Sequence, residues 1–482
     1  MVIRQGQIYW MDKTTIPSLC PLCSLWLFAV LVLSATAGEY VLPMLPEGLQ
    51  ATVVAKAPEI TGPASVAVSP DGRSVYIGTR WAGGKDSDDR VRLARDTHDD
   101  GSYDLIQTFA EESPGPQGLL CVGDTVYFLH APYLTALREL DGGGRAGEKK
   151  RLLTGLGSKS TKWLPNQLAA RLALGVDGWL YIALGDCGAY DGKGTDGKTF
   201  QLYGGGIIRV RPDGTDVEVC CQGLRNTVAL AVDPELNILV RDNSNDGSGL
   251  SARSLHVRPG ADFGYPNLFQ NYPEETLPAM QEHGGGLPSA ALFYAESGLR
   301  PEDRDKLFVA DWGRGMIFRC SLVRKGASFE LRQDQWLNPQ FPFRPVALAT
   351  DASGNLYVAD WGQNNWGRPA VSGAVLKISP KNAHGPRLLP DFKALSVEAL
   401  ATLLGRPGQT VRLLAQKELL MRGEAASADD ALVAVAVTAA REQVMRILKS
   451  TFKAASVSSS GAQALEWHSA CVLFHRFVQV VL

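Results

Sequence analysis

The sequence predicts an all-β fold, a six-bladed β-propeller, followed by a short all-α region. A polar turn and a short run of β-branched and aromatic residues recur six times in the middle of the chain. The six runs begin at Ser74, Thr125, Trp179, Asn237, Lys306 and Asn355. Each run follows a turn with aspartate, at Asp71, Asp124, Asp177, Asp233, Asp303 and Asp351. Several short strands that repeat about every 50 residues are typical of propeller blades.

The spacing of these turns assigns the propeller to residues 40–385. Successive turn aspartates lie 48 to 70 residues apart, and most runs are preceded by a second apolar strand, such as Ser65–Val68. Two β-sandwiches are the alternative, but their strands would not repeat one strand–turn–strand unit six times. The 50 glycines and 27 prolines among 482 residues agree with a turn-rich fold and disagree with a mostly helical one.

The composition excludes two classes of protein. Apolar residues make up 45% of the chain, which is ample for a folded core and excludes intrinsic disorder. The 48 basic and 50 acidic side chains give a formal net charge of −2. Since no basic surplus is available to neutralise phosphates, we expect no nucleic-acid partner.

Residues 1–37 are interpreted as a secretory signal peptide. An apolar run at Leu25–Leu33 follows the basic residues Arg4 and Lys13 and precedes an Ala-x-Ala pattern that ends at Ala37. A permanent single-span anchor is the alternative, but it needs about 20 apolar residues and a basic segment after them, and neither is present. We therefore expect the mature chain to be periplasmic or secreted.

The eight cysteines fall into two groups. Cys20 and Cys23 have the spacing of a covalent haem attachment, but Ser24 stands where that chemistry needs histidine, so we expect no covalent haem. The other six could pair in an oxidising compartment or remain single buried thiols, and their spacing leaves both interpretations open. They are Cys121, Cys187, Cys220, Cys221, Cys320 and Cys471.

Helical periodicity replaces the strand pattern over residues 386–482. One apolar stripe covers residues 397–404 and a second covers residues 411–419, with a Pro-Gly linker between them, and a third helix is expected from about Asp429 to Leu448. Such helices suggest packing of the HEAT type, which could present a surface to a protein partner. Because these arrays need several units, we interpret the short one here as a truncated or frame-altered end.

An oxygen-rich loop carries Asp96, Asp100 and Asp104 around a turn glycine. Carboxylates at alternating positions suit a hard cation such as Ca²⁺, which takes roughly six to eight oxygen ligands. His98, in the same loop, is a poor ligand for that ion. Two interpretations stay open, a bound Ca²⁺ and a solvated acidic turn.

Motifs of common hydrolases and nucleotide-binding proteins are missing from the sequence. The chain has no Gly-x-Ser-x-Gly elbow, no His-Glu-x-x-His helix and no P-loop. Polar stretches instead follow several strand-like runs, where the loops of a propeller converge on its central channel. They are Gly223–Asn226, Arg241–Gly247, Phe263–Pro266 and the two Ala-Asp-Trp-Gly motifs at 310–313 and 359–362.

Together these motifs resemble the soluble PQQ-dependent glucose/sorbosone dehydrogenases. The resemblance is closer to the bacterial "membrane-bound dehydrogenase domain" proteins, in which such a propeller precedes HEAT repeats and often a haem c domain. It covers about residues 45–425. It implies PQQ and Ca²⁺ as cofactors, a sugar or alcohol as substrate and an external electron acceptor.

The resemblance also implies site residues. Arg225 and Asn226 match residues that contact the quinone, and Arg344 matches a second arginine beside it. A guanidinium is apt because PQQ is a tricarboxylate whose reduced form gains negative charge. Ser244 and Asn245 stand where two main-chain carbonyls hold the Ca²⁺ of the cofactor. Ion pairing within the channel wall is the alternative role for the two arginines.

The chain departs from the family pattern at two positions. Gln167 stands where the sugar dehydrogenases have the histidine that takes the proton of the substrate hydroxyl, and glutamine has no titratable group to serve as general base. Gly313 stands where they have a cofactor lysine, with Arg314 beside it. Sugar oxidation by the family mechanism is therefore expected to be impaired or absent unless another residue acts as base.

Three functional hypotheses follow. The first is a periplasmic or secreted quinoprotein dehydrogenase, and the second is a non-catalytic propeller that binds carbohydrate or protein. The third is a propeller lactonase with a metal held by carboxylates, for which Asp242 and Asp246 are the candidates.

Overall fold

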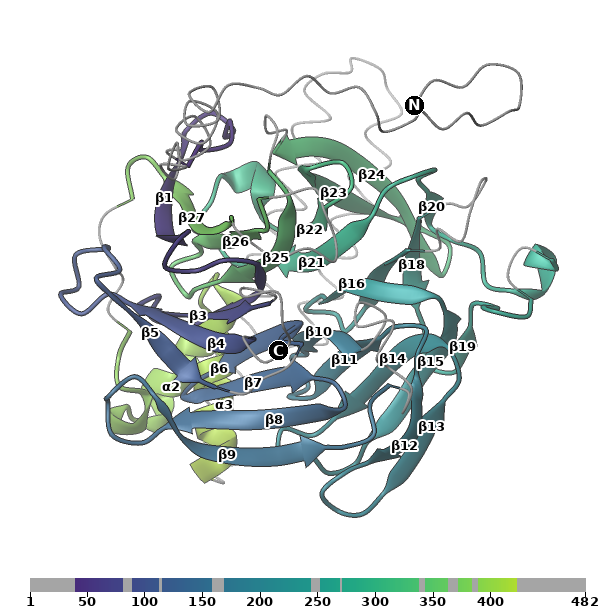
Figure 1. Cartoon of the computed structure of the whole chain (residues 1–482), viewed down its shortest axis with the longest axis horizontal. Coiled ribbons are helices and arrows are strands. Elements are labelled where there is room, and N and C mark those ends of the chain that lie inside the picture. The colour runs from purple at the N-terminus through teal and green to yellow at the C-terminus, as the bar shows by residue number, and fades with distance from the viewer. Residues whose placement is uncertain are drawn as a thin grey trace, which may run out of the picture. The chain divides into compact units, whose positions relative to one another are not determined.

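Six sheets arranged around a central channel form the body of the computed structural model (Figure 1). The structure describes residues 40–80, 89–111, 115–157, 169–243, 252–268, 271–337, 343–362, 372–383 and 389–422. The predicted six-bladed β-propeller is confirmed.

The first three blades follow one another along the chain. Blade 1 contains β2 (Pro63–Val68), β3 (Ser74–Thr79), β4 (Arg90–Arg95) and β5 (Leu105–Ala110). Blade 2 contains β6 (Gly118–Val122), β7 (Thr125–His130), β8 (Tyr133–Glu139) and β9 (Ala146–Leu153). Blade 3 contains β10 (Ala169–Leu174), β11 (Leu180–Leu184), β14 (Gly205–Val210), β15 (Glu218–Leu224) and β19 (Ala261–Asp262). A separate hairpin, β12 (Ala189–Lys193) and β13 (Thr199–Leu202), is inserted in blade 3.

The other three blades complete the circle. Blade 4 contains β16 (Asn226–Val232), β17 (Ile238–Asn243), β18 (Arg253–Val257) and β20 (Gln281–Glu282). Blade 5 contains β21 (Pro288–Tyr294), β22 (Lys306–Asp311), β23 (Met316–Lys325) and β24 (Ser328–Leu337). Blade 6 contains β25 (Pro345–Thr350), β26 (Leu356–Asp360), β27 (Ala374–Pro380) and β1 (Leu49–Lys56). Short 3₁₀ turns occur at η4 (Pro273–Glu275), η5 (Pro301–Asp303) and η6 (Phe392–Ala394).

The ring closes through a strand from the other end of the propeller sequence. The first strands of the blades contact one another in order around the channel, from β2 through β6, β10, β16, β21 and β25 back to β2. In blade 6, β1 pairs with β27 in antiparallel register, with Leu49 opposite Pro380. Closure in this way leaves no open gap between the first and last blades.

The six predicted aspartate turns occupy equivalent places, each between the first and second strand of its blade. We call this end of the propeller the turn face. Asp351 accepts hydrogen bonds from the Asn355 amide, 3.0 Å, and side chain, 2.7 Å. Asp233 accepts the same pair of bonds from Asn237, at 2.8 and 2.7 Å. These two carboxylates therefore satisfy backbone and side-chain donors within their own turns.

The core lies between neighbouring blades. One cluster joins blades 2 and 3 through residues that are 0% exposed, namely Leu129, Leu134, Leu180, Ile182 and Ile208. Side chains alternate along a strand, so each sheet can present apolar residues to both of its neighbours.

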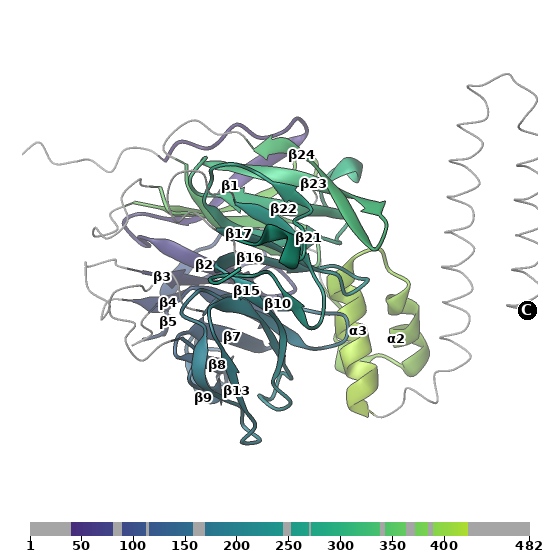
Figure 2. The ribbon, with the colours of Figure 1, turned by 90° about the vertical axis from the view of Figure 1, so that its right-hand side faces the viewer.

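Two helices follow the propeller. α2 (Val397–Leu404) is capped by Ser396, whose hydroxyl accepts from the Ala399 amide, 3.2 Å. α3 (Gln409–Arg422) lies between α2 and the turn face (Figure 2). Both predicted helices are present, but a single pair does not confirm the HEAT-like array. Its proposed third helix, from Asp429, lies outside the described residues, as does the predicted signal peptide.

The described cysteines are free thiols. They are Cys121, Cys187, Cys220, Cys221 and Cys320, whereas Cys471 lies outside the described residues. Burial raises the pKa of Cys187 and Cys220 to about 11. Among the helices that the structure describes, none is long and apolar enough to span a membrane.

Candidate functional site

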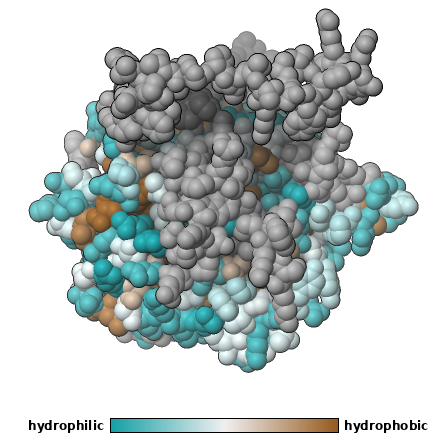
Figure 3. Space-filling view, viewed as in Figure 1, coloured by the Kyte–Doolittle hydropathy of each residue, from teal (hydrophilic) through white to brown (hydrophobic). Residues whose placement is uncertain are grey.

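The end of the propeller opposite the turn face carries the polar motifs, and we call it the arginine face, after Arg171, Arg225 and Arg344. Figure 1 looks onto this face. In the same view, Figure 3 shows a described surface that is mostly hydrophilic or intermediate, with small separate hydrophobic patches.

Two of the polar stretches lie against each other at this face. β15 pairs in parallel with β19, with Gln222 opposite Asp262. The Tyr265 amide donates to the Gly223 carbonyl, 2.9 Å. Gly223 has a φ of +75°, and a Cβ there would lie 2.1 Å from Oδ1 of Asp262. Glycine is thus required where the Gly-Leu-Arg-Asn and Phe-Gly-Tyr-Pro stretches meet.

Arg225 and Asn226 follow at the junction between blades 3 and 4. Nη1 of Arg225 donates to the Asn243 carbonyl, 3.3 Å, and its Nε lies 3.5 Å from a carboxylate oxygen of Asp186. Asn226 begins β16 and is 7% exposed. In the described structure its Oδ1 is buried and accepts no hydrogen bond. Asp186 therefore partly compensates the charge of Arg225, while Asn226 has an acceptor oxygen without a hydrogen bond.

The two Ala-Asp-Trp-Gly motifs end the second strands of blades 5 and 6. Oδ1 of Asp360 accepts from the Arg344 amide, 2.6 Å. Oδ1 of Asp311 accepts in the same way from the Leu287 and Arg314 amides, both at 3.0 Å. Each aspartate thereby fixes the backbone that leads into the first strand of its own blade.

Arg344 lies beside the tryptophan of the first motif. The carbon at the centre of its guanidinium is 5.6 Å from the centre of the Trp312 ring, within the range of a cation–π contact. Nη1 also donates to the Phe343 carbonyl, 3.2 Å. Burial lowers the pKa of Arg344 from its ordinary value, with nearby Asp360 opposing that shift.

A pocket of about 170 Å³ opens beside these residues. Its polar and aromatic lining consists of Arg80, Gln117, Arg171, Asn226, Asn243, Ser289, Trp312 and Trp361. Two guanidinium groups favour an anionic ligand, and the tryptophan rings favour a flat one. The described lining contains no carboxylate or imidazole, so none of it can serve as a general base near neutral pH.

Arg171 connects four blades inside the channel. From β10 in blade 3, its guanidinium donates to carbonyls on three other blades, those of Gln117, Ser289 and Val346. The bonds from Nη2 to Ser289 and Val346 are both 2.6 Å. Burial lowers the pKa of Arg171 to about 10, which still leaves it charged at neutral pH.

Several predicted site residues lie outside the described residues. They are Gln167, Ser244, Asn245 and Asp246. Asp242, the other candidate for a lactonase metal, pairs with Arg253 at 2.6 Å and is 0% exposed. Its charge is therefore already compensated by a buried partner.

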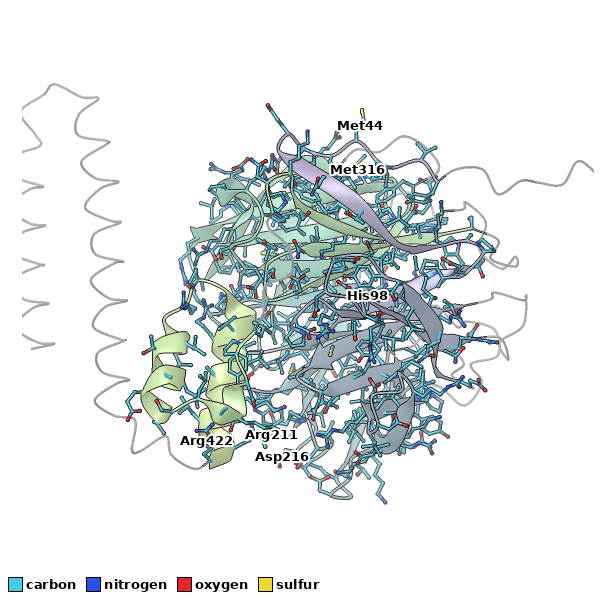
Figure 4. The ribbon with its side chains drawn as sticks, turned by 90° about the vertical axis from the view of Figure 1, so that its left-hand side faces the viewer. Met44, His98, Arg211, Asp216, Met316 and Arg422 are labelled. Carbon is cyan, nitrogen blue, oxygen red and sulfur yellow. The ribbon has the colours of Figure 1, made fainter. Side chains whose placement is uncertain are left out.

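The acidic loop between β4 and β5 satisfies its own carboxylates (Figure 4, His98). Asp96 accepts from the amides of His98, Asp100 and Gly101. Asp104 accepts from the Thr97 hydroxyl, 2.6 Å. Nowhere in the described ranges do three or more acidic, histidine or cysteine side chains gather to hold a metal ion. These bonds supply a turn-forming role for the loop, and Ca²⁺ binding there stays a prediction.

Sequence reasoning placed Asn226 at the site but missed Arg171 and the tryptophans of the pocket as lining residues. One signal was available, because Arg171 is the single charged residue in the otherwise apolar strand β10. A charge at such a position needs polar partners, and a propeller supplies them from the neighbouring blades.

Comparison with known families places the fold in context. The model of a family described as "Domain of unknown function (DUF7133)" matches residues 43–365. No curated protein matches.

Solved structures of similar fold include sugar dehydrogenases. One is a putative oxidoreductase (glucose dehydrogenase) from Thermus thermophilus, 22% identical, with a TM-score of 0.50 over 69% of this chain and 100% of that one. Another is the soluble aldose sugar dehydrogenase of Escherichia coli in its apo form, 16% identical, with a TM-score of 0.50 and the same coverage. At these identities the likeness establishes the fold. The narrower resemblance to the "membrane-bound dehydrogenase domain" proteins stays a prediction.

Proposed function

The chain belongs to the DUF7133 family, and we propose that its propeller is a quinoprotein-type oxidoreductase of sugars or alcohols that binds PQQ and Ca²⁺ at the arginine face. The observation that carries this proposal is the buried Oδ1 of Asn226, which has no hydrogen bond in the described structure and lines a pocket together with Arg80 and Arg171. A buried polar atom without a protein partner is expected where a ligand completes the site.

The residues present fit PQQ in charge and chemistry. From the family resemblance, Arg225, Asn226 and Arg344 would hold the cofactor; of these Asn226 lines the pocket, where Arg171 adds positive charge. The guanidinium groups match its three carboxylates, and Trp312 and Trp361 offer flat surfaces to its rings. From the family resemblance, the main-chain carbonyls of Ser244 and Asn245 would hold Ca²⁺.

Substrate oxidation needs a proton acceptor as well as a quinone. Bound PQQ would supply a two-electron acceptor for hydride from the hydroxyl-bearing carbon of the substrate. In this chain Gln167 stands at the base position and the described lining contains no base, so a different group would have to take the proton. The side-chain amide can orient a hydroxyl through hydrogen bonds but cannot take up its proton at neutral pH. We therefore expect cofactor binding with slow turnover.

The same observation favours a second candidate, a non-catalytic propeller that binds carbohydrate or protein at the arginine face. It needs no base, and the polar lining suits sugar hydroxyls. The two candidates differ in whether PQQ binds at all.

Calorimetry of the mature chain with PQQ and Ca²⁺ separates them. We expect binding that weakens at least tenfold in Arg225→Met. The matched control is Arg324→Met, in an exposed ion pair between blade 5 and Glu235 of blade 4. No heat of binding to the wild-type protein would refute the quinoprotein proposal and leave the binding propeller. A dye-reduction assay with a panel of sugars and alcohols then measures turnover.

Gln167→His tests the position of the base. If the resemblance aligns this residue correctly, the variant binds PQQ as the wild type does and reduces dye at least tenfold faster. A variant that binds PQQ and stays as slow as the wild type would show that the alignment of residue 167 is wrong or that a second group is missing.

We also propose that the chain is exported and loses residues 1–37, on the basis of the apolar run and the Ala-x-Ala pattern. Amino-terminal sequencing of the protein from the extracytoplasmic fraction should begin near Gly38. A protein that retains Leu25–Leu33 and stays with the membrane would support the anchor instead.

A further inference from the structure

A second, larger pocket lies at the turn face, on the far side of the channel from the arginine face. It has a volume of about 530 Å³ and lies between the ends of the first strands and helix α3. The lining is mainly apolar and includes Val68, Leu174, Val232 and Phe293 from the strands and Leu413 and Leu414 from the helix. The two pockets have no lining residue in common, so this one is a separate site.

Helix α3 is held over the pocket by specific hydrogen bonds to two blades. The Thr410 amide and hydroxyl both donate to Oε1 of Glu296, each at 2.7 Å, which fixes the first turn of α3 on blade 5. Further along α3, the Gln416 side chain donates to the Val176 carbonyl of blade 3, 2.9 Å. Figure 2 shows α3 along this side of the propeller, and Figure 4 labels Arg422 at its far end. The helix is therefore a fixed wall of the pocket.

Glu296 is a polar residue of the pocket lining with one oxygen that accepts no hydrogen bond. It lines the pocket and is 3% exposed, and its Oε1 is occupied by Thr410. Its Oε2 is buried and accepts no hydrogen bond in the described structure. A Cβ on residue 408 would lie 2.5 Å from Oε2, so only glycine at this position leaves room for that oxygen. A buried carboxylate oxygen without a donor carries an unrecovered cost of desolvation, which a donor on a ligand would offset.

The charged groups of α3 do not fill this role. Arg412 directs Nη1 to the carbonyls of Arg406 and Pro407, both at 2.9 Å. Lys417 lines the pocket but is exposed and sits near Gly123 of blade 2. Burial raises the pKa of Glu296, and Thr410 and Arg412 oppose that shift. Whether charged or neutral, the carboxyl group retains an oxygen that can accept a hydrogen bond.

We propose that this pocket binds a small, mainly apolar molecule with a single hydrogen-bond donor, a hydroxyl or an amine, and that the donor pairs with Oε2 of Glu296. The volume lies within the range of about 300–1,000 Å³ that small-molecule sites occupy. Apolar walls with one convergent polar group are the usual composition of such sites.

Three probes with one alkyl chain and different head groups test the proposal by calorimetry on the mature chain, namely decylamine, decan-1-ol and decanoate. We expect the amine and the alcohol to bind at least tenfold more tightly than decanoate, which brings a second carboxylate to Glu296. Tighter binding of the amine identifies a cationic ligand, and tighter binding of the alcohol identifies a neutral one. No binding of any probe, or equal binding of all three, overturns the proposal.

Glu296→Gln tests the pairing atom. The amide keeps an oxygen for Thr410 and places a donor where Oε2 was, so we expect amine affinity to fall at least tenfold and the preference over decanoate to disappear. Glu398→Gln, on the exposed side of α2, should change neither. Leu413→Trp, which fills the pocket, should weaken the amine and the alcohol without affecting PQQ binding. Unchanged probe affinities in both pocket variants overturn the proposal.

Discussion

The two faces of the propeller differ in the ionisable groups whose pKa burial shifts. At the turn face burial raises the pKa of two carboxyl groups, Asp351 and Glu296. At the arginine face burial lowers the pKa of Arg171 and Arg241 to about 10 and that of His283 to about 3. Arg241 is only 1% exposed.

The buried groups indicate which ligands each end of the propeller favours. Buried guanidinium groups hold positive charge that is poorly solvated, so the arginine face favours an anion such as a polycarboxylate. A buried carboxyl oxygen without a partner favours a hydrogen-bond donor, so the turn face favours an alcohol or amine. The two ends of the propeller therefore differ in the ligand that they favour.

The largest effect is expected from replacing Arg171, whose guanidinium joins four blades at the arginine face. Arg171→Met leaves the carbonyls of Gln117, Ser289 and Val346 without their shared donor in a buried setting. We expect the free energy of unfolding to fall by about 3 kcal/mol or more, measured by urea denaturation. Arg171→Lys should recover part of the loss, since lysine keeps the charge but not the fork of donors. A loss under about 1 kcal/mol would show that the hydrogen bonds of Arg171 do not stabilise the junction of the four blades.

The next largest difference is expected between alanine substitutions at two glycines with the same backbone conformation, one at each face. Gly223 at the arginine face and Gly178 at the turn face have φ values of +75° and +76°. A Cβ at residue 223 would clash with Asp262, whereas at residue 178 nothing lies within 4 Å. We expect Gly178→Ala to cost about 1 kcal/mol of stability from backbone strain alone, and Gly223→Ala to cost about 2 kcal/mol and to weaken PQQ binding. Equal losses in the two variants would contradict the close contact at Gly223.

Acid should affect the two faces in opposite directions. His283 has a pKa lowered from 6.5 to about 3, so its contribution to stability is present above pH 6.5 and is lost as the pH falls below that value. Glu296 has a raised pKa, so its contribution is present below its ordinary value of 4.5 and is lost as the pH rises. Each effect is limited to about 1.4 kcal/mol per pH unit.

Unfolding free energies measured from about pH 7.5 to about pH 4.5 test these signs. Compared with the wild type, His283→Gln should lose less stability on acidification and Glu296→Gln should lose more. Parallel pH profiles for the two variants would show that the faces do not differ in this way.

The smallest effect is expected at the surface. Arg324 and Glu235 form an ion pair at 2.6 Å, but their side chains are 71% and 67% exposed. Arg324→Met should change the free energy of unfolding by less than about 0.5 kcal/mol, because exposed pairs are solvated and screened. A loss comparable to that of Arg171→Met would mean that burial does not distinguish the arginines.

Local patterns were sufficient to predict the blades. Asp233 and Asp351 each accept a hydrogen bond from an asparagine four residues later, so all the residues that form the turn lie in one short stretch. The helices at 397–404 and 409–422 also followed from their own periodicity. Less of the candidate site could be predicted from the sequence, because its contacts join residues that are far apart in the chain.

Arg171 shows why. Its three carbonyl partners lie 54, 118 and 175 residues away, and no pattern near β10 names them. The contact of Thr410 with Glu296 spans 114 residues, so the pocket at the turn face exists only once α3 has docked. Asn226 was predicted because a family motif identified it, whereas its missing hydrogen bond could only be seen in the folded chain.

Hydrogen–deuterium exchange of the mature chain with and without PQQ and Ca²⁺ reports which face of the propeller binds the anion. We predict that PQQ slows exchange in peptides covering residues 222–228 and 343–346 and leaves residues 409–422 of α3 unchanged. Slower exchange in α3, or no change at the arginine face, would mean that PQQ does not bind at the arginine face.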